Sequence, residues 1–379
     1  MVDQNTSNDA QPRKTNKISL AILIFLTVIV IGLITTYILE QKEIKTARQL
    51  AAAQELIDQA KFSDAILVLN EVIANNPNSV EAYSLRSTAF GNSRSNVFNE
   101  QQNYFVSSLH DLDKLIELQP TNGNHYVNRD LILRALAETA TDSATKFAIY
   151  ELANDNAEKA IELGVSPDYS YVYRHHARNL IESNHCQEGL EETQNLINQT
   201  NPQDPIMSTY NIYLTEAYIC LGDLKKALET AQQIQCDNPV GTCRSGFMAE
   251  IYYQSGETEK ALEILNNMIN TNSAYGGWRY FIRAAIYYEM GEDNLARQDL
   301  ATGDNYTWYG NGVYWYVKAK MAFDDGDDEN AILYLQYAES TLDVQYTPLR
   351  QEILKELRNR GVDPLIIAPQ LPLATTPIP

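Results

Sequence analysis

The sequence lacks a surplus of positive charge. It holds 29 Lys and Arg residues against 49 Asp and Glu residues, a formal net charge of −20 over 379 residues. Proteins that bind nucleic acid need Lys and Arg to replace the counterions of the phosphates, so we expect no nucleic-acid partner. With 44% apolar residues, 24 Tyr and few biased runs, the composition also excludes collagen-like and fully disordered classes.

Motifs of catalysis and metal binding are also lacking. The sequence holds no GxSxG nucleophile elbow, no phosphate-binding Gly loop and no CxxC pair. Adjacent His175 and His176 point about 100° apart on a helix, whereas a helical zinc pair needs positions i and i+4. The acidic run from Asp324 to Glu329 lacks the ligand order of a calcium loop. We therefore predict a protein that is not an enzyme and that uses no cofactor and no metal.

One long apolar run lies near the N-terminus. Residues 18–39, ISLAILIFLTVIVIGLITTYIL, carry no formal charge. As a helix with a rise of about 1.5 Å per residue, they span roughly 33 Å, which matches a bilayer core. A cleavable signal peptide has a shorter apolar core of about 7 to 15 residues that ends in small residues. We therefore predict an uncleaved transmembrane signal anchor at 18–39, behind a tail at 1–17.

The orientation of this anchor is not decided by counting basic residues. Three lie on each side of the run: Arg13, Lys14 and Lys17 before it, and Lys42, Lys45 and Arg48 after it. The upstream charges lie closer to the apolar edge, and the short tail ahead of them has no reason to be exported. We predict a cytoplasmic tail, a single pass through the cell membrane and an extracytoplasmic location for the bulk of the chain.

A pattern with a period of 34 to 35 residues follows the anchor. In four segments a Gly precedes an Ala by five residues, and an apolar residue follows four positions later; these are the segments around Ala227, Ala261, Ala296 and Ala331. Related forms surround Ala65 and Gly189, the second with Gly in the Ala place. Two helices joined by a tight turn need a small residue where they cross, and a Pro after the second helix redirects the chain.

This pattern resembles the tetratricopeptide repeat (TPR) family, whose units of about 34 residues form a helix-turn-helix. Aromatic residues occupy the family's Trp place (Tyr83, Tyr126, Tyr173, Tyr280 and Trp315) and its Tyr place (Tyr218, Tyr252 and Tyr287). The family's Leu-Gly pair is mostly replaced. The resemblance implies an all-α fold, a TPR-type α-solenoid of about eight helix-turn-helix repeats.

The resemblance also implies the domain limits. We expect the solenoid at 40–346, a capping helix at 347–360 that seals its last apolar surface, and a Pro-rich tail at 361–379. Within the array, residues 80–166 form two overlong units, with SRSNVFNEQQ and the TDSATK region as insertions. The alternative is a generic helical region there and a solenoid that begins at 167. The tail is expected to be extended, or else to fold its LII and LPL segments back into the solenoid groove.

A partner-binding groove follows from the resemblance, because the first helix of each unit lines the concave face in this family. Helical spacing carries the matching outward positions onto Arg174, Arg178, Ile212, Glu216, Glu250, Tyr253, Trp278, Phe281, Tyr288, Tyr316, Lys320 and Phe323. These side chains form an aromatic stripe flanked by charges that suits a peptide or a partner helix. The alternative use of the aromatic residues is packing between units.

The four Cys residues fall at shared helix ends of the repeat. This placement allows disulfides between Cys186 and Cys220 and between Cys236 and Cys243. Two bridges would imply an oxidising compartment, in agreement with the expected topology. The alternative is four buried thiols that lie there by chance.

Together these features predict a membrane-anchored scaffold or adaptor that mediates protein–protein interaction or complex assembly at the cell envelope. A first alternative is a membrane-anchored receptor of the same family that faces the cytosol. A second is an envelope protein that binds or acts on glycans by stacking exposed Tyr and Trp on sugars.

Overall fold

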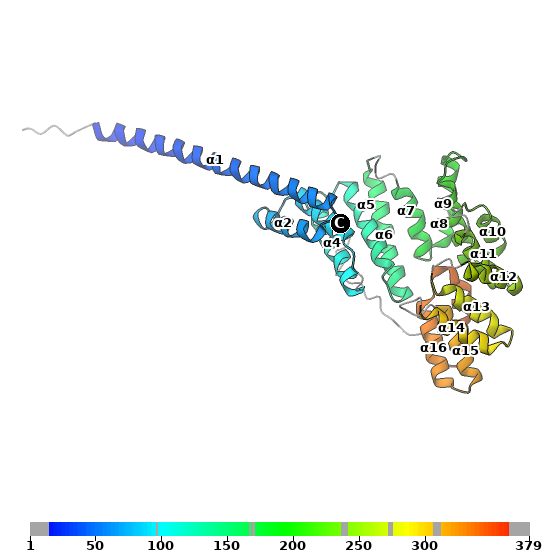
Figure 1. The fold of residues 1–379 in the computed structure, drawn as a ribbon. Helices are drawn as coiled ribbons and strands as arrows, with labels where there is room; N and C mark the ends of the chain where they lie inside the picture. The colour runs from blue at the N-terminus through cyan, green and yellow to red at the C-terminus, as the bar shows by residue number, and fades with distance from the viewer. Residues whose placement is uncertain are drawn as a thin grey trace, which may run out of the picture. The chain divides into compact units, whose positions relative to one another are not determined.

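The computed structural model describes residues 15–95, 98–166, 168, 171–235, 242–271, 276–305 and 312–363. Within these ranges the regular elements are all helical, which confirms the expected all-α fold (Figure 1). Two compact units make up the chain, Met1–Ala89 and Phe90–Pro379. The helices are α1 Thr15–Asp58, α2 Phe62–Asn75, α3 Val80–Asn92, α4 Phe98–Leu118, α5 Gly123–Ala137, α6 Ser143–Leu163, α7 Val172–Glu182, α8 Cys186–Gln199, α9 Met207–Cys220, α10 Leu224–Ala231, α11 Thr242–Gln254, α12 Thr258–Asn270, α13 Trp278–Glu289, α14 Asp293–Gly303, α15 Gly312–Asp324, α16 Asp328–Thr341, the 3-10 turn η2 Val344–Tyr346, and α17 Thr347–Asn359.

The first unit is built on one long helix. Helix α1 runs without interruption from the apolar run into the repeat pattern. Its last turns pack on α2 and bury Leu50 and Ala53 against Leu69, Val72 and Ala82. The apolar side chains earlier in α1 are exposed, for example Phe25 at 65% and Leu33 at 65%.

Six helix pairs share one turn geometry. Each turn contains a residue with positive φ, five positions before the small residue of the second helix: Ala60, Asn184, Gly222, Gly256, Gly291 and Gly326. The amide of the next residue donates to the carbonyl five positions earlier, at 2.8 to 2.9 Å in all six turns. Left-handed backbone favours Gly because Gly has no Cβ. The hydrogen bond between residues five positions apart ends the first helix. The Gly-to-Ala spacing in the sequence therefore marks a turn and a helix crossing.

The small residues at the crossings are fully buried. Ala65, Ala227, Ala261, Ala296 and Ala331 are all 0% exposed. Gly189 takes this place between α7 and α8, where a Cβ would lie only 3.1 Å from the carbonyl oxygen of Ala177 and from the amide nitrogen of Ile181. These two helices therefore approach more closely than an Ala allows.

We expect Gly189→Ala to destabilise the protein by up to about 2 kcal/mol, although Ala is the residue found at this place in the other repeats. Overpacking costs about 1 to 3 kcal/mol, and the better helix propensity of Ala recovers only about 1. Urea unfolding followed by circular dichroism measures the change. Asn195→Ala, at an exposed position of the same helix, is the control and should change stability by less than about 0.5 kcal/mol. An equal response of both variants would contradict the close crossing.

Helices of the second unit stack in chain order from α4 to α16, each against the next, except that α15 packs on α13 rather than on α14. Helices α4 and α6 each contain 21 residues, whereas α8 contains 14. The extra residues of the overlong repeats thus lengthen the second helix as well as the turn. Because α4, α5 and α6 pack in series with α7, the regular stacking is not confined to residues beyond 167.

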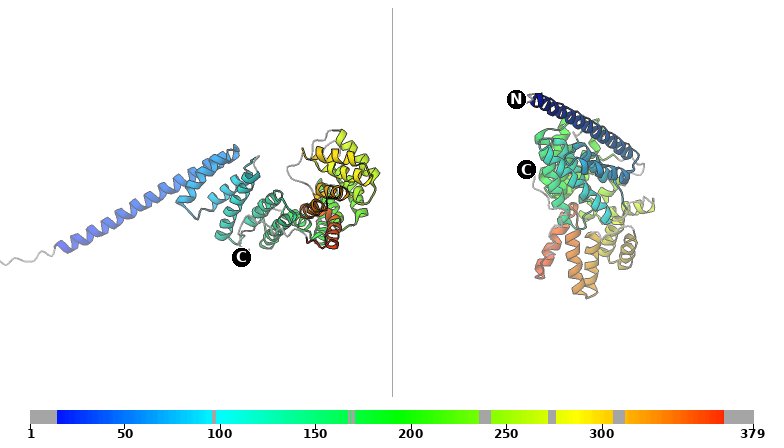
Figure 2. Two further views of the ribbon diagram at one scale, coloured as in Figure 1. Left: turned by 90° about the horizontal axis from the view of Figure 1, so that it is seen from below. Right: turned by 90° about the vertical axis from the view of Figure 1, so that its left-hand side faces the viewer.

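The stack of the second unit returns on itself. Helix α16 contacts α6, and η2 contacts α9 (Figures 1 and 2). Helix α17 follows η2 and buries Ile353 and Leu357, both 0% exposed, in the core around α15 and α16. The LII and LPL segments of the tail lie outside the described residues.

Candidate functional site

Five first helices, α7, α9, α11, α13 and α15, carry the twelve residues predicted to form a groove. Nine of the twelve are half-buried: Arg174, Arg178, Ile212, Tyr253, Trp278, Tyr288, Tyr316, Lys320 and Phe323. Glu216 is 8% exposed, Glu250 is 5% exposed, and Phe281 is fully buried. Most of this set is therefore only partly open to solvent.

Two of the predicted aromatic residues pack between helices. The ring of Phe281 lies 5.1 Å from the ring of Tyr314, measured between centroids, and it contacts Gly303. Trp278 lies against Gly246 of α11. These contacts match packing between units, and a role of the twelve residues in partner binding stays a prediction.

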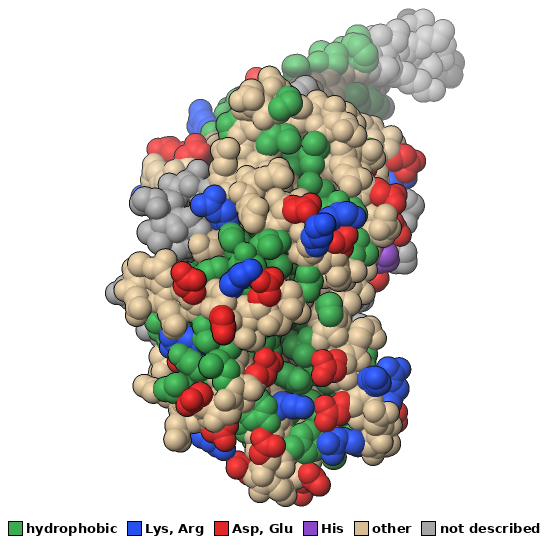
Figure 3. Space-filling view, turned by 90° about the vertical axis from the view of Figure 1, so that its right-hand side faces the viewer, with side chains coloured by type: hydrophobic (Ala, Val, Ile, Leu, Met, Phe, Trp, Pro, Cys, Tyr) green, Lys and Arg blue, Asp and Glu red, His purple; other side chains and the backbone are tan. Residues whose placement is uncertain are grey.

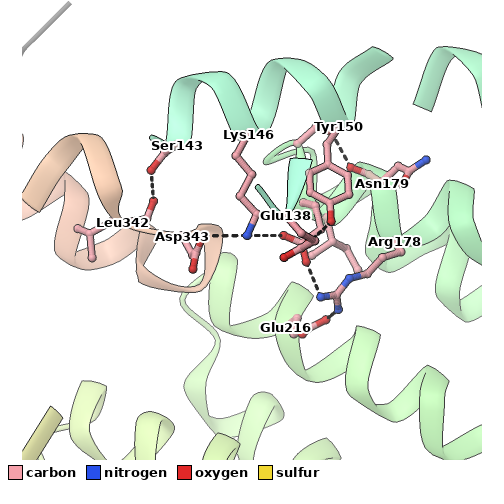
Figure 4. Close-up of polar contacts among 12 residues, drawn as sticks. Glu138, Ser143, Lys146, Tyr150, Arg178, Asn179, Glu216, Leu342 and Asp343 are labelled. Atoms are coloured by element: carbon pink, nitrogen blue, oxygen red, sulfur yellow. Dashed lines mark hydrogen bonds and ion pairs between the residues drawn. The ribbon is translucent and has the colours of Figure 1, made fainter. Parts of the chain in front are cut away.

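Arg178 is the centre of a polar network on the first helices (Figure 4). Its guanidinium pairs with Glu182 on its own helix and with Glu216 on α9. The same group lies over the ring of Tyr213, 5.5 Å from the centroid. A buried charge is tolerated when it is paired with an opposite charge and hydrogen-bonded, as Arg178 is here.

The N-terminal turn of α6 holds the returning end of the chain (Figure 4). The Oγ of Ser143 donates to the carbonyl of Leu342 at 2.5 Å, and the Nζ of Lys146 lies 2.9 Å from an Oδ1 of Asp343. Arg350 lies over the ring of Phe147, 5.0 Å from the centroid. These contacts join residues almost 200 positions apart, so they close the second unit.

Residues beyond Asp343 then lie on the first helices. Val344 is 4% exposed and packs with Ile181 and Ala217. The side-chain amide of Gln254 donates to the carbonyl of Gln345 at 3.0 Å. A segment of the chain itself therefore occupies part of the face on which the groove was predicted.

Two further residues extend this contact. Tyr346 is 2% exposed, and burial, together with the carboxyl groups of Glu250 and Asp343, raises the pKa of its hydroxyl well above the ordinary value. The hydroxyl of Thr347 donates to the side-chain carbonyl of Asn184 at 3.4 Å. Both contacts reach the ends of first helices, α11 and α7.

The pKa values of Lys146 and Glu250 are both raised, which keeps Lys146 charged and Glu250 neutral. Burial alone would lower the pKa of Lys146, but the carboxylates of Asp343, Glu182 and Glu138 outweigh it and raise that pKa. Burial, strengthened by the charge of Asp343, raises the pKa of Glu250 to about 8. Lys146 thus stays charged, whereas Glu250 holds a proton at neutral pH.

A disulfide lies beside this segment. Cys186 and Cys220 are joined, with their Cα atoms 6.2 Å apart, and the bridge packs in one cluster with Val344. It fixes the start of α8 to the end of α9. Cys236 and the side chain of Cys243 lie outside the described residues, so the second predicted pair stays a prediction.

The repeat features combine in one fold. A left-handed turn residue and a buried small residue occur together in six helix pairs, and in the last four of these pairs they recur every 34 to 35 residues. The chain has the tetratricopeptide-repeat fold. Helix α17 begins at Thr347, the residue at which the capping helix is expected to begin.

Comparisons with known proteins find only distant likenesses. No family model and no curated protein matches this sequence. Similar solved structures include a TPR protein of Parabacteroides merdae (16% identity, 82% of this chain, 97% of that chain, TM-score 0.37), the TPR protein TTC0263 of Thermus thermophilus (14%, 54%, 98%, 0.36) and human IFIT1 (14%, 82%, 74%, 0.48). Identities and TM-scores are low, so the assignment rests on the helix pairs of this chain itself.

The long first helix of the chain has the length and composition of a membrane span. Its stretch Ile22–Asp58 contains a window of mean hydropathy 2.8, with none of that window buried. Length and composition suit either a membrane anchor or a signal sequence.

A hollow of about 690 Å³ lies in the first unit, just beyond the apolar run. Helix α1 and the turn between α2 and α3 line it with both apolar and charged side chains, among them Leu39, Lys42, Leu50, Pro77 and Glu81. Lys42 donates to the carbonyl of Asn75 at 3.1 Å, which ties α1 to the end of α2.

The histidines and the acidic run serve structural contacts. The Nδ1 of His175 lies 2.7 Å from buried Asp130, which also accepts from Asn179 at 2.7 Å. Asp327 accepts from the amide of Asn330 and caps helix α16. Within the described ranges no group of three or more His, Cys, Asp or Glu residues is placed to hold a metal ion.

Sequence reasoning did not single out Ser143 or Lys146 as site residues. Both belong to the segment TDSATK, which the repeat spacing marks as an insertion. The insertion itself was the available signal, because it lengthens α6 and so provides extra residues for a contact outside the regular repeat.

Proposed function

We propose that this chain is a single-pass membrane protein whose TPR array is a non-catalytic scaffold for a protein partner at the cell envelope. The observation that carries the proposal is the unbroken helix α1, which holds both the apolar run and the first helix of the array. From Leu39 to the first repeat at Thr46 the helix rises only about 10 Å. The first repeat, and a partner held there, would stay near the bilayer surface.

The disulfide supports an extracytoplasmic array. Bridges persist in oxidising compartments and are rare in the reducing cytosol. Cys186 and Cys220 come from neighbouring helices whose ends meet, so the bridge fits the stack without displacing it. A receptor that faces the cytosol would keep these two thiols reduced.

The first helices offer the surface for a partner. They present half-buried aromatic side chains, such as Tyr253 and Tyr316, beside charged ones, such as Arg174. The face of the molecule in Figure 3 shows acidic and basic side chains scattered among apolar ones. A mixed surface of this kind suits a protein or peptide better than a polyanion.

A photo-reactive amino acid at Arg174 in the full chain, within native membranes, is expected to capture an envelope protein. The same amino acid at Glu229, an exposed position on the second helix α10, is the matched control and should capture none. Equal capture at both positions, or none at either, would contradict a partner surface on the first helices. Reaction of Cys186 and Cys220 with maleimide in the absence of reductant would instead favour the array facing the cytosol.

A further inference from the structure

The segment Leu342–Tyr346 has the conformation of a bound peptide. Leu342 has φ −72° and ψ 128°, and Asp343 has φ −70° and ψ 168°, so both are extended. A single 3-10 turn, Val344–Tyr346, follows. Successive side chains of an extended stretch point to opposite sides, and they can therefore enter different subsites.

Each part of the segment meets a different element. Ser143 and Lys146 on α6 hold the carbonyl of Leu342 and the carboxylate of Asp343, at 2.5 and 2.9 Å. Val344 is buried in one apolar cluster with Ile181 on α7 and Ala217 on α9. Gln254 on α11 holds the backbone of Gln345 at 3.0 Å. The surface thus contacts, in chain order, a carboxylate, an aliphatic side chain and a main-chain carbonyl.

We propose that this surface, the closing seat formed by Ser143, Lys146, Ile181, Ala217 and Gln254, is a peptide-binding site. Residues 342–346 occupy it in cis. The protein partner enters it with a segment of the same chemistry and shape: an extended acidic residue, then a single turn that carries an aliphatic residue, a polar residue and an aromatic residue. This inference rests on the proposed scaffold function and names its partner and its regulation.

Two features favour exchange of the cis segment. The side chain of Asp343 is 42% exposed, so water can compete for its ion pair with Lys146. Glu250, 5% exposed, receives a hydrogen bond from Gln254 at 3.2 Å and faces Asp343 and Tyr346. A buried acid beside a second carboxylate is unfavourable. At neutral pH the closed seat therefore costs the free energy of keeping Glu250 protonated, and opening relieves this cost.

The test uses a fluorescent peptide with the sequence TLDVQYTP, residues 341–348, and the full chain in detergent micelles. The host is a cis-anchor variant with Asp343→Ala, Val344→Ser and Tyr346→Ser. Fluorescence anisotropy should show saturable binding to this variant. Binding to the natural sequence should be at least about 100-fold weaker, because a tethered segment competes at an effective concentration in the millimolar range.

Two controls make the result specific. The peptide TLKVQATP, with the charge reversed and the aromatic ring removed, should not bind. Adding Lys146→Met to the cis-anchor variant should weaken binding of TLDVQYTP by about tenfold or more, because a charge-assisted contact is lost. A folded cis-anchor variant, with its helical spectrum and its Cys186–Cys220 bridge intact, that does not bind the peptide would overturn the proposal.

A second measurement serves if the cis-anchor variant does not fold. Hydrogen exchange of residues 342–346 in the natural sequence should become faster in excess TLDVQYTP, and unchanged exchange would overturn the proposal. A mass of two chains that Asp343→Ala reduces to one would assign the seat to a second copy and also overturn it. Capture of an envelope protein at Arg174 without peptide binding would leave the scaffold function standing and reject the closing seat alone.

Discussion

Lys146→Met is expected to destabilise the second unit by about 1.5 to 3 kcal/mol. The side chain of Lys146 is 15% exposed, and its Nζ lies 2.9 Å from Asp343 and 3.9 Å from Glu182. Met keeps the length of the side chain and removes the charge, so Glu182 loses a cation while it stays 8% exposed. Glu182 keeps its ion pair with Arg178, so the loss comes from the charge-assisted contacts of Lys146 itself and not from an unpaired buried charge.

Lys159→Met is the matched control, since Lys159 lies on the same helix and pairs with Glu162 across one turn at 3.0 Å. Glu162 is 67% exposed, so this exposed pair should contribute less than about 1 kcal/mol. Urea unfolding and hydrogen exchange measure both variants. Because helical repeats need not unfold in one step, the loss in Lys146→Met should show first as faster exchange at residues 342–347. Equal effects of the two variants would show that the closing contact stabilises nothing.

The hairpins are the part of the fold that the sequence predicts well. Their signals are local: a residue able to adopt positive φ, a small residue five positions later and an apolar residue one turn beyond. Gly222 and Ala227 illustrate the pattern, and Asn184 with Gly189 shows the same turn with different residues. A local signal of this kind does not depend on the rest of the chain.

The closure of the second unit was not predictable in the same way. It depends on the small rotation between successive repeats, which adds up over many helix pairs before α16 meets α6. The sequence near Ser143 marks only an insertion, and the sequence near Asp343 marks only the end of a repeat. Their juxtaposition follows from curvature, for which the pattern carries no local signal.

Phe281 illustrates a second limit. Helical spacing places it on the outward stripe of α13, yet it is 0% exposed. Gly303 at the end of α14 has no side chain, and the ring of Phe281 fills the space that a Cβ would need. The position of Phe281 on its own helix therefore did not reveal the gap that Gly303 leaves on the next helix.

Glu250→Gln is expected to make the protein more stable at high pH and to change little at low pH. The pKa of Glu250 is raised from 4.5 to about 8 by burial and by the charge of Asp343. Between these values the folded chain holds a proton that the unfolded chain releases, so stability falls as pH rises by about 1.4 kcal/mol per unit. The contribution is complete below pH 4.5 and lost above about pH 8. Gln resembles the protonated acid and stays neutral, so it removes this fall.

The difference between Glu250→Gln and the natural sequence should therefore grow from near zero at pH 5 to about 2 to 5 kcal/mol at pH 8.5. Urea unfolding at several pH values between these limits measures it. Glu263→Gln, at an exposed carboxylate on the neighbouring helix α12, is the control and should show no such divergence. Since Glu250 faces Asp343 and Tyr346, hydrogen exchange at residues 342–346 should also become faster with pH beyond the intrinsic base-catalysed trend in the natural sequence, and less so in Glu250→Gln. Parallel pH profiles for all three proteins would mean that Glu250 is ionised in the closed seat, and that burial beside Asp343 does not favour opening.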